Sequence, residues 1–440
     1  MNIALGNFGA LPVRGEENRR NWRVAKTRGI KMTIKQKLCL LAGASLIAFS
    51  TNAFADGTVR VTIAEYSKGT GPYFEEAAKA FEAANPDTKI QIEVVPWDNL
   101  QQKLTTDISA GANADLSIIG TRWLLDFVKE GIVAPLDENI TPDFKARFID
   151  TFLSPSVMNG KVYGLPIAAS ARAMYYNKDI FAKAGIDTPP ATWADFKTDA
   201  EKIKKLGGEI YGFGLQGKEI ETDVYFYYGM WSNGGEIVKD GKSGLDSQAA
   251  IDTAKLYKSF IDEGLTQPGV TSYSREDVQN LFKQGKVATV ITAPFLSNQI
   301  KTEAPNLKYG VAPIPAGPTG DKGTYGVTDS IVLFENSKNK EAAWKFLDFL
   351  FTTEQRTKFD KVEGFLPVNA EESKDPYFAD NADLKVFTSL LPNARFAPVI
   401  PGWEDIAQTT SNAIQKIYLG EGEPEATLKE AAAKVNETLK

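Results

Sequence analysis

Alternating strand-like and helix-like segments between residues 58 and 131 constrain the fold of this chain more than any other feature. In residues 58–66 apolar side chains occupy every second position, as in a strand, whereas residues 72–86 carry them at helical spacing. The alternation continues with strand patterns at 89–95 and 114–119, each followed by a helical pattern. This order predicts a parallel sheet with crossover helices. In such sheets, ligands bind beyond the carboxyl ends of the strands.

A second α/β region follows later in the chain. It begins with a helical pattern over 192–208, where Thr192 and Asp195 can form a capping box. Two further strand patterns occupy residues 210–216 and 287–292. A chain of 440 residues exceeds the size at which single hydrophobic cores usually stop growing. We therefore expect two α/β lobes.

The N-terminal segment has the pattern of a secretory signal peptide. Lys35 and Lys37 precede an apolar run over 38–49, and small residues stand at Ala53 and Ala55. The run is too short to cross a bilayer, which needs roughly 20 apolar residues. We expect cleavage after Ala55 and a secreted mature chain.

Residues 1–31 are basic and show no hydrophobic period. We favour Met32 as the true start, and a start at Met1 with a long basic region is the alternative.

Charge and residue usage exclude several classes of function. Without residues 1–55 the chain has 41 basic and 54 acidic residues, a net charge of about −13, which repels nucleic acid and anionic lipid. The chain has no histidine, and its only cysteine, Cys39, lies in the expected signal peptide with no lipobox before it. These absences remove the usual base of Ser/His and Cys/His nucleophile systems, as well as His and thiolate metal ligands. We therefore expect no catalytic residues, no metal and no other cofactor.

Several motifs along the mature chain together resemble one known family. They are VYGLP at 162–166, MYYNKDIFAKAGIDTPPATWADF at 174–196, NGG at 233–235, YGVAPIPAG at 309–317 and EAAWKFLDFLFTTEQRTKF at 341–359. They are similar to the extracellular solute-binding proteins of ABC importers, in the carbohydrate-binding family 1 that includes maltose-binding protein. The tract from Tyr163 to Phe196 is the most specific.

The resemblance implies a two-lobed periplasmic-binding-protein fold of type II, each lobe a mostly parallel sheet flanked by helices and joined to the other by hinge strands. The implied first lobe comprises residues 56–168 and 314–351, and the second comprises 169–313 and 352–440. Crossings between the lobes are expected at 162–177, at 311–315 and near Thr352.

The resemblance also implies a function. A small carbohydrate would be captured in the cleft between the lobes and delivered, by hinge closure in the periplasm, to ABC permease subunits with their ATPase. We expect a monomer that is not an enzyme.

A sugar presents apolar C–H faces and a rim of hydroxyls, so its pocket needs flat aromatic rings with polar side chains at their edges. Residues of both kinds stand in the loops after the expected strands and at positions marked by the resemblance. The candidate ligand-binding residues are Tyr66, Ser67, Trp97, Thr121, Arg122, Trp123, Ser170, Arg172, Trp231, Asn233, Phe295, Tyr325, Thr328, Asp329 and Trp403. Trp231 is the favoured stacking platform because it adjoins SNGG.

Other ligand classes stay open at this stage. Arg122 and Arg172 would suit a sugar acid or sugar phosphate, because guanidinium binds planar oxyanions in a bidentate manner. Asp329 and Glu404 would suit a polyamine. A periplasmic carbohydrate-active enzyme that works with carboxylates is a further alternative. We favour a neutral sugar because aromatic residues are abundant in the loops.

Overall fold

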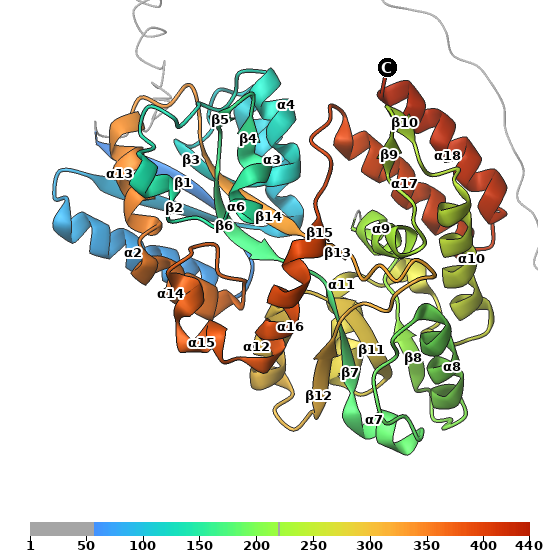
Figure 1. Ribbon diagram of the computed structural model, residues 1–440. Helices are drawn as coiled ribbons and strands as arrows, with labels where there is room; N and C mark the ends of the chain where they lie inside the picture. Colours follow the sequence, from blue (N-terminus) through green and yellow to red (C-terminus); the bar gives the residue numbers. More distant parts are fainter. Residues whose placement is uncertain (1–56, 219–220) are drawn as a thin grey trace, which may run out of the picture. The chain divides into compact units, whose positions relative to one another are not determined.

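The computed structural model describes residues 57–218 and 221–440. The predicted signal peptide, its cleavage site and both candidate start residues lie outside the described residues. Among the described helices, none combines the length and apolar character needed to cross a membrane. The described residues form two lobes, each built around its own sheet (Figure 1).

The first lobe is built on a five-stranded sheet with the strand order β2-β1-β3-β14-β6. Its strands are β1 (Thr58–Glu65), β2 (Lys89–Pro96), β3 (Leu116–Gly120), β6 (Leu165–Ser170) and β14 (Val327–Leu333). β1 pairs in parallel with β2 and β3, as the alternating pattern predicts, whereas β14 is antiparallel to β3 and β6. The sheet is therefore mixed rather than mostly parallel, because β14 enters from the second lobe and meets β3 from the opposite direction.

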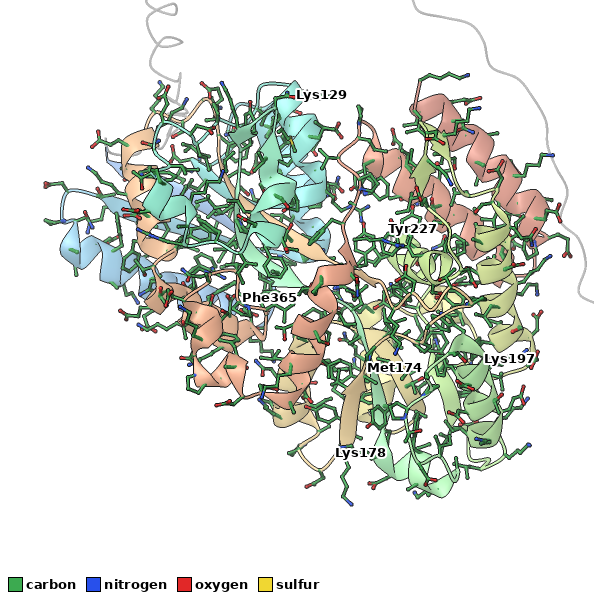
Figure 2. All side chains as sticks on the ribbon, in the orientation of Figure 1. Lys129, Met174, Lys178, Lys197, Tyr227 and Phe365 are labelled. Atoms are coloured by element: carbon green, nitrogen blue, oxygen red, sulfur yellow. The ribbon has the colours of Figure 1, made fainter. Side chains whose placement is uncertain are left out.

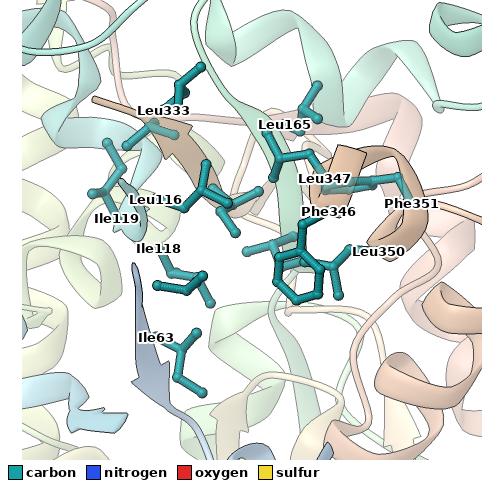
Figure 3. Close-up of a cluster of buried hydrophobic side chains, with 14 of the residues drawn as sticks. Ile63, Leu116, Ile118, Ile119, Leu165, Leu333, Phe346, Leu347, Leu350 and Phe351 are labelled. Carbon is teal, nitrogen blue, oxygen red and sulfur yellow. The ribbon is translucent and has the colours of Figure 1, made fainter. Parts of the chain in front are cut away.

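The helices of the first lobe pack around this sheet and enclose one core. They are α2 (Thr70–Ala84), α3 (Trp97–Ser109), α4 (Leu124–Lys129), α5 (Pro142–Lys145), α6 (Asp150–Leu153), α13 (Lys340–Leu350) and α14 (Thr353–Glu363). On α13, the side chains of Phe346, Leu347 and Leu350 are buried in the same cluster as Ile118 of β3 and Leu165 of β6 (Figure 3). The core thus joins a late helix of the chain to its early strands.

The second lobe has a four-stranded sheet in the order β12-β7-β11-β8. Its strands are β7 (Ala173–Asn177), β8 (Tyr211–Gly214), β11 (Val287–Thr292) and β12 (Tyr309–Ala312). β7 is antiparallel to β11 and β12, and β11 is parallel to β8, so this sheet is also mixed.

Helices surround the second sheet and extend the lobe beyond it. They are α7 (Lys178–Lys183), α8 (Trp193–Lys204), α9 (Thr222–Ser232), α10 (Gln248–Asp262), α11 (Arg275–Lys283), α12 (Phe295–Glu303), α15 (Pro376–Ala379), α16 (Ala382–Leu390), α17 (Trp403–Tyr418) and α18 (Pro424–Thr438). The predicted capping box of Thr192 and Asp195 is confirmed at the start of α8. Figure 2 shows the contrast between buried Met174 and Tyr227 and the exposed amines of Lys129 and Lys178.

Three pairs of very short strands complete the described structure. They are β4 (Val157–Met158) with β5 (Lys161–Val162), β9 (Val238–Lys239) with β10 (Lys242–Ser243), and β13 (Thr324–Tyr325) with β15 (Ala394–Arg395).

The chain passes between the two sheets at two described connections. β6 lies in the first sheet and β7 in the second, with only Ala171 and Arg172 between them, and Pro166 lies in β6 at the sheet edge, where proline costs no ladder bond. The chain returns between β12 and β14. The third crossing was expected near Thr352, but Phe359 and Phe365 still pack in the first core. After them, Leu366 enters the cluster that also contains Val290 of β11.

Candidate functional site

Candidate side chains gather at one edge of the first sheet. Tyr66 follows β1, Trp97 follows the last residue of β2, and Thr121 follows β3. Because parallel strands end at the same edge, these residues lie close together. β14 runs the other way, so its beginning reaches this edge, and Asp329 pairs with Gly120. Sequence order and strand direction together therefore build one wall of the site.

A pocket opens beside this wall and is lined by both lobes. We call it the cleft pocket, and it holds about 870 Å³ of empty space, including the part open to solvent. Its lining residues are Trp97, Gln101, Gly120, Thr121, Arg122, Trp123, Leu125, Pro155, Met158, Glu221, Val224, Tyr325, Gly326, Val327, Thr328, Asp329, Phe396, Ala397, Pro398, Val399, Ile400 and Glu404.

A row of aromatic rings stands on the first-lobe side of the pocket. The rings of Tyr66 and Trp97 stack with centroids 6.0 Å apart, and those of Trp97 and Trp123 stack at 5.6 Å. Trp123 is buried, whereas Trp97 is partly exposed and lines the pocket. Trp97 is therefore the ring of this row that combines partial exposure with a place in the pocket lining.

A second aromatic stack lies on the other side of the pocket. Tyr325 lines the pocket, and the ring of Trp231 stacks behind it with centroids 5.4 Å apart. Tyr227 of α9 also stacks on Tyr325, at 6.4 Å. Tyr325 is therefore the ring of this stack that faces the pocket.

Arg122 joins the two lobes through carboxylates. Its Nε donates to Oε1 of Glu404 in α17, and its Nη2 donates to Oε2 of the same carboxylate at 3.1 Å. A third nitrogen, Nη1, lies 3.9 Å from Oδ2 of Asp223 at the start of α9. Burial alone would lower the pKa of Arg122, but the charges of Asp223 and Glu404 raise it overall. The guanidinium is thus a permanent cation that is already paired.

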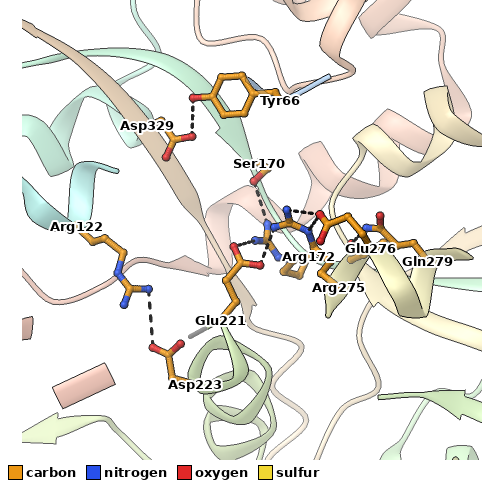
Figure 4. Close-up of polar contacts among 11 residues, drawn as sticks. Tyr66, Arg122, Ser170, Arg172, Glu221, Asp223, Arg275, Glu276, Gln279 and Asp329 are labelled. Carbon is orange, nitrogen blue, oxygen red and sulfur yellow. Dashed lines mark hydrogen bonds and ion pairs between the residues drawn. The ribbon is translucent and has the colours of Figure 1, made fainter. Parts of the chain in front are cut away.

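Glu221 is held by two other arginines (Figure 4). Nη1 of Arg275 donates to Oε2 of Glu221 at 2.7 Å, and Nη2 of Arg172 lies 3.8 Å from its Oε1. Arg172 also donates to the hydroxyl of Ser170 at 3.0 Å. Burial opposes ionisation of Glu221, but Arg275 and Arg172 outweigh it and lower its pKa. Glu221 therefore presents a fixed carboxylate to the pocket.

Asp329 is almost fully buried and accepts a hydrogen bond from the hydroxyl of Tyr66 at 2.8 Å (Figure 4). Burial raises its pKa to about 7, with a further contribution from the charge of Glu221, while the Tyr66 hydrogen bond opposes the rise. Burial likewise raises the pKa of Asp223 to about 7, against the opposing charge of Arg122. Both carboxyl groups are therefore close to half-protonated near neutral pH.

Several buried polar atoms beside the pocket make no hydrogen bond of normal geometry to any described residue. They are both carboxylate oxygens of Asp223, the hydroxyls of Tyr325 and Thr328, and Nε of Arg172. Such groups usually find a partner because an unsatisfied buried polar atom costs roughly 1–3 kcal/mol. Tyr325 and Thr328 line the pocket, and Asp223 and Arg172 lie beside its lining residues Arg122 and Glu221. Such an arrangement suits a hydroxyl-rich molecule.

Comparison with known proteins identifies the family. Residues 64–357 match the family described as bacterial extracellular solute-binding protein, which is more than half of the chain. The chain belongs to this family. The resemblance stated from the motifs is therefore confirmed, and proteins of this family act outside the cytoplasm as binding proteins.

Relatives of this solute-binding protein cover almost all of its length. A binding protein of Brucella abortus (strain 2308), whose description names no ligand, is 71% identical over 407 residues, which cover 92% of this chain and 99% of that protein. The maltotriose-binding protein of Pyrococcus abyssi (strain GE5 / Orsay) is 27% identical over 352 residues, covering 78% of this chain and 74% of that protein.

Solved structures agree on the architecture. The crystal structure of an ABC transporter solute-binding protein from Thermotoga lettingae TMO, bound with alpha-D-tagatose, matches with a TM-score of 0.81 at 26% identity. The match covers 87% of this chain and 100% of that chain. The predicted type II two-lobed fold is confirmed.

The predicted site residues of this solute-binding protein fall into three groups. Seven line the cleft pocket: Trp97, Thr121, Arg122, Trp123, Tyr325, Thr328 and Asp329. Three are bonded to residues that line it or to one another: Tyr66, Ser170 and Arg172. The other five do not line it: Ser67, Trp231, Asn233, Phe295 and Trp403.

The residues outside the pocket make identifiable packing contacts. Trp231 is 3% exposed and Trp403 1% exposed, both in the second-lobe core, because their helices turn these rings inward. Asn233 ends α9 and bonds to the carbonyl of Gly229, and the hydroxyl of Ser67 accepts from the amide of Gly69. Phe295 packs edge-on against Phe365 at 6.3 Å.

Sequence reasoning missed several residues of this solute-binding protein's site. Glu221 and Asp223 are acidic residues at the start of α9, a helix whose residues are all buried. Acidic residues directly before a strongly apolar helical segment could have indicated that these carboxylates have a function. Gln101 carries no comparable mark. The apolar segment 396–400 precedes α17 and could have been noticed as an apolar loop.

Proposed function

We propose that this protein captures a neutral carbohydrate in the cleft pocket and presents it, in the periplasm, to the permease subunits and ATPase of an ABC importer. The observation that carries the proposal is a set of buried polar atoms that make no hydrogen bond of normal geometry to any described residue. The hydroxyls of Tyr325 and Thr328 line the pocket together with the partly exposed ring of Trp97, and the carboxylate of Asp223 lies beside the lining residue Arg122. Sugar hydroxyls can both donate and accept, so they suit a carboxylate and two hydroxyls at once. The indole face suits the C–H surface of a pyranose or furanose ring.

The charges at the pocket favour a neutral ligand over an anion. Arg122 is bound in a bidentate manner by Glu404, the geometry in which it would otherwise hold a ligand carboxylate or phosphate. Arg172 and Arg275 are both engaged with Glu221. A sugar acid or sugar phosphate would have to displace a carboxylate from a paired arginine.

A polyamine fits less well for a related reason. Asp223 and Asp329 have pKa values near 7, so burial leaves each only partly ionised at neutral pH. Glu221 and Glu404 are already paired with arginines. The four carboxyl groups and three arginines therefore nearly cancel, and no strong anionic site is left for an ammonium group.

Capture and delivery would be linked through closure of the lobes. A ligand that touches both walls binds the closed form more tightly and shifts the population toward it. Moving the equilibrium from 1:99 to 99:1 takes about 5.5 kcal/mol, which is available from a micromolar ligand worth roughly 8 kcal/mol. We propose hinges at the β6–β7 and β12–β14 passages and a third near residues 352–366, and a monomer as the acting unit.

The relatives lend support to a carbohydrate. The relative from Pyrococcus abyssi is named for maltotriose, and the Thermotoga lettingae structure contains alpha-D-tagatose. The carboxylate-enzyme alternative would require turnover, so incubation with labelled oligosaccharides distinguishes it from binding.

The proposal is tested first by ligand screening. In a thermal-shift panel of sugars, polyols, sugar acids, sugar phosphates and polyamines, neutral sugars should stabilise the purified secreted protein and the charged compounds should not. Stabilisation by polyamines or sugar acids alone would exclude the neutral carbohydrate.

The role of Asp223 gives a sharper test with the sugar that the panel identifies. Asp223→Ala removes a buried acceptor and should weaken binding roughly 10- to 100-fold by calorimetry, equivalent to about 1.5–3 kcal/mol for a hydrogen bond to a charged group. Asp246, exposed on the same lobe, supplies the control Asp246→Ala, which should bind normally. Equal affinities of the two variants would remove Asp223 from the site.

A further inference from the structure

The cleft pocket has an apolar side that a bare sugar does not need. The connection between β15 and α17 contributes five consecutive lining residues, 396–400, with the sequence FAPVI. We call this segment the apolar loop, and it can be followed in Figure 1 between the labels β15 and α17. Proline at 398 and again at 401 restricts its backbone. Gly326, which also lines the pocket, lies against the ring of Phe396.

The first lobe supplies apolar side chains to the same pocket. Leu125 of α4, Pro155 and Met158 line it together with the partly exposed ring of Trp97. From the remaining elements, Val224 of α9 and Val327 of β14 line it as well. Most of the lining side chains are therefore apolar, and they come from both lobes.

Val399 shows that part of this apolar surface is uncovered. Its side chain is 50% exposed, which places it among five large exposed apolar residues of the described chain. The other four, Val94, Leu206, Val362 and Leu419, do not line the cleft pocket. An exposed apolar side chain at the lining of a ligand pocket is a surface that a ligand can remove from water.

A free sugar cannot cover this surface without cost. Its hydroxyls would have to leave water for a wall that offers no hydrogen-bond partner, and burying an unpaired hydroxyl is unfavourable. Polar side chains that can satisfy hydroxyls line only part of the pocket. They are Gln101, Thr121, Arg122, Glu221, Tyr325, Thr328, Asp329 and Glu404. The lining therefore matches a molecule with one polar and one apolar part.

We infer that the ligand of the cleft pocket is an amphiphilic glycoside, a sugar that carries an apolar alkyl or aryl group. The sugar contacts the polar atoms of Asp223, Tyr325 and Thr328, and the apolar group lies against the apolar loop and Met158. This inference rests on the proposed function, since it specifies which class of carbohydrate the same pocket takes.

The test compares matched ligands. Common hexoses and pentoses are first screened by thermal shift, each as the free sugar and as its methyl, hexyl and phenyl glycosides. For the sugar whose compounds stabilise the purified secreted protein most, calorimetry then measures the affinity of each form. The hexyl or phenyl glycoside should bind at least tenfold more tightly than the free sugar, because each buried methylene strengthens binding about fourfold.

A variant pair then assigns the effect to the apolar loop. Val399→Ser should weaken binding of the hexyl or phenyl glycoside about three- to tenfold and leave the free sugar or methyl glycoside unchanged. Val362→Ser, at an exposed valine outside the pocket, is the matched control and should alter neither affinity. Retained binding of the free sugar shows that both variants are folded.

The outcomes separate the inference from the function on which it rests. If the free sugar binds as tightly as its apolar glycosides, or if Val399→Ser weakens both equally, the amphiphilic ligand is excluded while carbohydrate binding stands. If no sugar or glycoside in the panel binds, the inference and the proposed carbohydrate function both fail.

Discussion

Burial disfavours the charged form of Asp329, a carboxyl group in the lining of the cleft pocket. Asp329 is 7% exposed, and the hydroxyl of Tyr66 donates a hydrogen bond to its carboxylate (Figure 4). The groups that influence its charge are Glu221, which raises its pKa, and Arg172 and Arg275, which lower it. The result is a pKa of about 7, so folding itself favours the protonated form of this residue.

This shift predicts a pH dependence of stability. The folded pKa of Asp329, about 7, lies above the ordinary value of 3.8, so the native state binds more protons than the unfolded state between these values. The stabilisation is complete below the lower value and is lost as the pH rises through 7. Asp329→Asn, which mimics the protonated group, should therefore raise the melting temperature relative to wild type at about pH 8 and much less at about pH 5.

The control for this measurement is Asp246→Asn, an exposed carboxylate whose removal should change little at either pH. A melting temperature of Asp329→Asn that differs from wild type by the same amount at both pH values would contradict the raised pKa.

At the scale of a single element, the helix α9 is packed by other parts of the protein on every side. All of its residues are buried, including the five consecutive aromatic or apolar positions before Gly229, which are residues 224–228. At Gly229 an added Cβ would lie 2.5 Å from the hydroxyl oxygen of Tyr257 and 2.7 Å from Cγ2 of Thr253. That tyrosine donates to the carbonyl of Tyr225, so it cannot move aside without breaking a buried hydrogen bond.

Gly229→Ala is therefore expected to destabilise the protein. The overpacking should lower the free energy of unfolding by about 1–3 kcal/mol, despite the better helix propensity of alanine. Denaturant unfolding measures the change.

Gly71 near the start of α2 provides the matched control, since an added Cβ would make only ordinary contact with Val94, at 3.4 Å. Gly71→Ala should be neutral or stabilising by up to about 1 kcal/mol. Similar effects of the two substitutions would mean that the space at Gly229 is less restricted than the structure indicates.

For the whole molecule, the bond between Arg122 and Glu404 connects parts that are 282 residues apart in the chain. Arg122 follows β3 in the first lobe, and Glu404 lies in the first turn of α17 in the second. Their side chains are 18% and 26% exposed, so solvent only partly screens the pair. Both residues line the cleft pocket, so the pair connects its two walls.

Glu404→Gln should weaken this connection while preserving the shape of the side chain. We expect the ligand-free variant to have a larger radius of gyration than wild type in small-angle X-ray scattering, because the open arrangement becomes more populated. Glu437→Gln, at an exposed position of α18, is the control and should scatter like wild type. Identical profiles for wild type and Glu404→Gln would show that the pair does not hold the lobes.

Much of the local structure could be predicted from the sequence, because periodicity depends on neighbours along the chain. The patterns at 58–66 and 89–95 correspond to β1 and β2, that at 192–208 to α8 and that at 287–292 to β11. Trp97 and Thr121, chosen because they follow expected strands, both line the cleft pocket. The direction of β14 could not be predicted from the sequence, because this strand enters its sheet from the other lobe and runs antiparallel to β3.

The sequence by itself determined the alternating elements, the two-lobed family and the aromatic candidates after the first strands, because each depends on a local pattern or an extended motif. Only the tertiary structure decided that Tyr325 rather than Trp231 faces the pocket, and that Glu221, Asp223 and residues 396–400 meet there. The physical reason is that a side chain's direction and its distant neighbours follow from how whole elements pack, and no spacing within one segment specifies either.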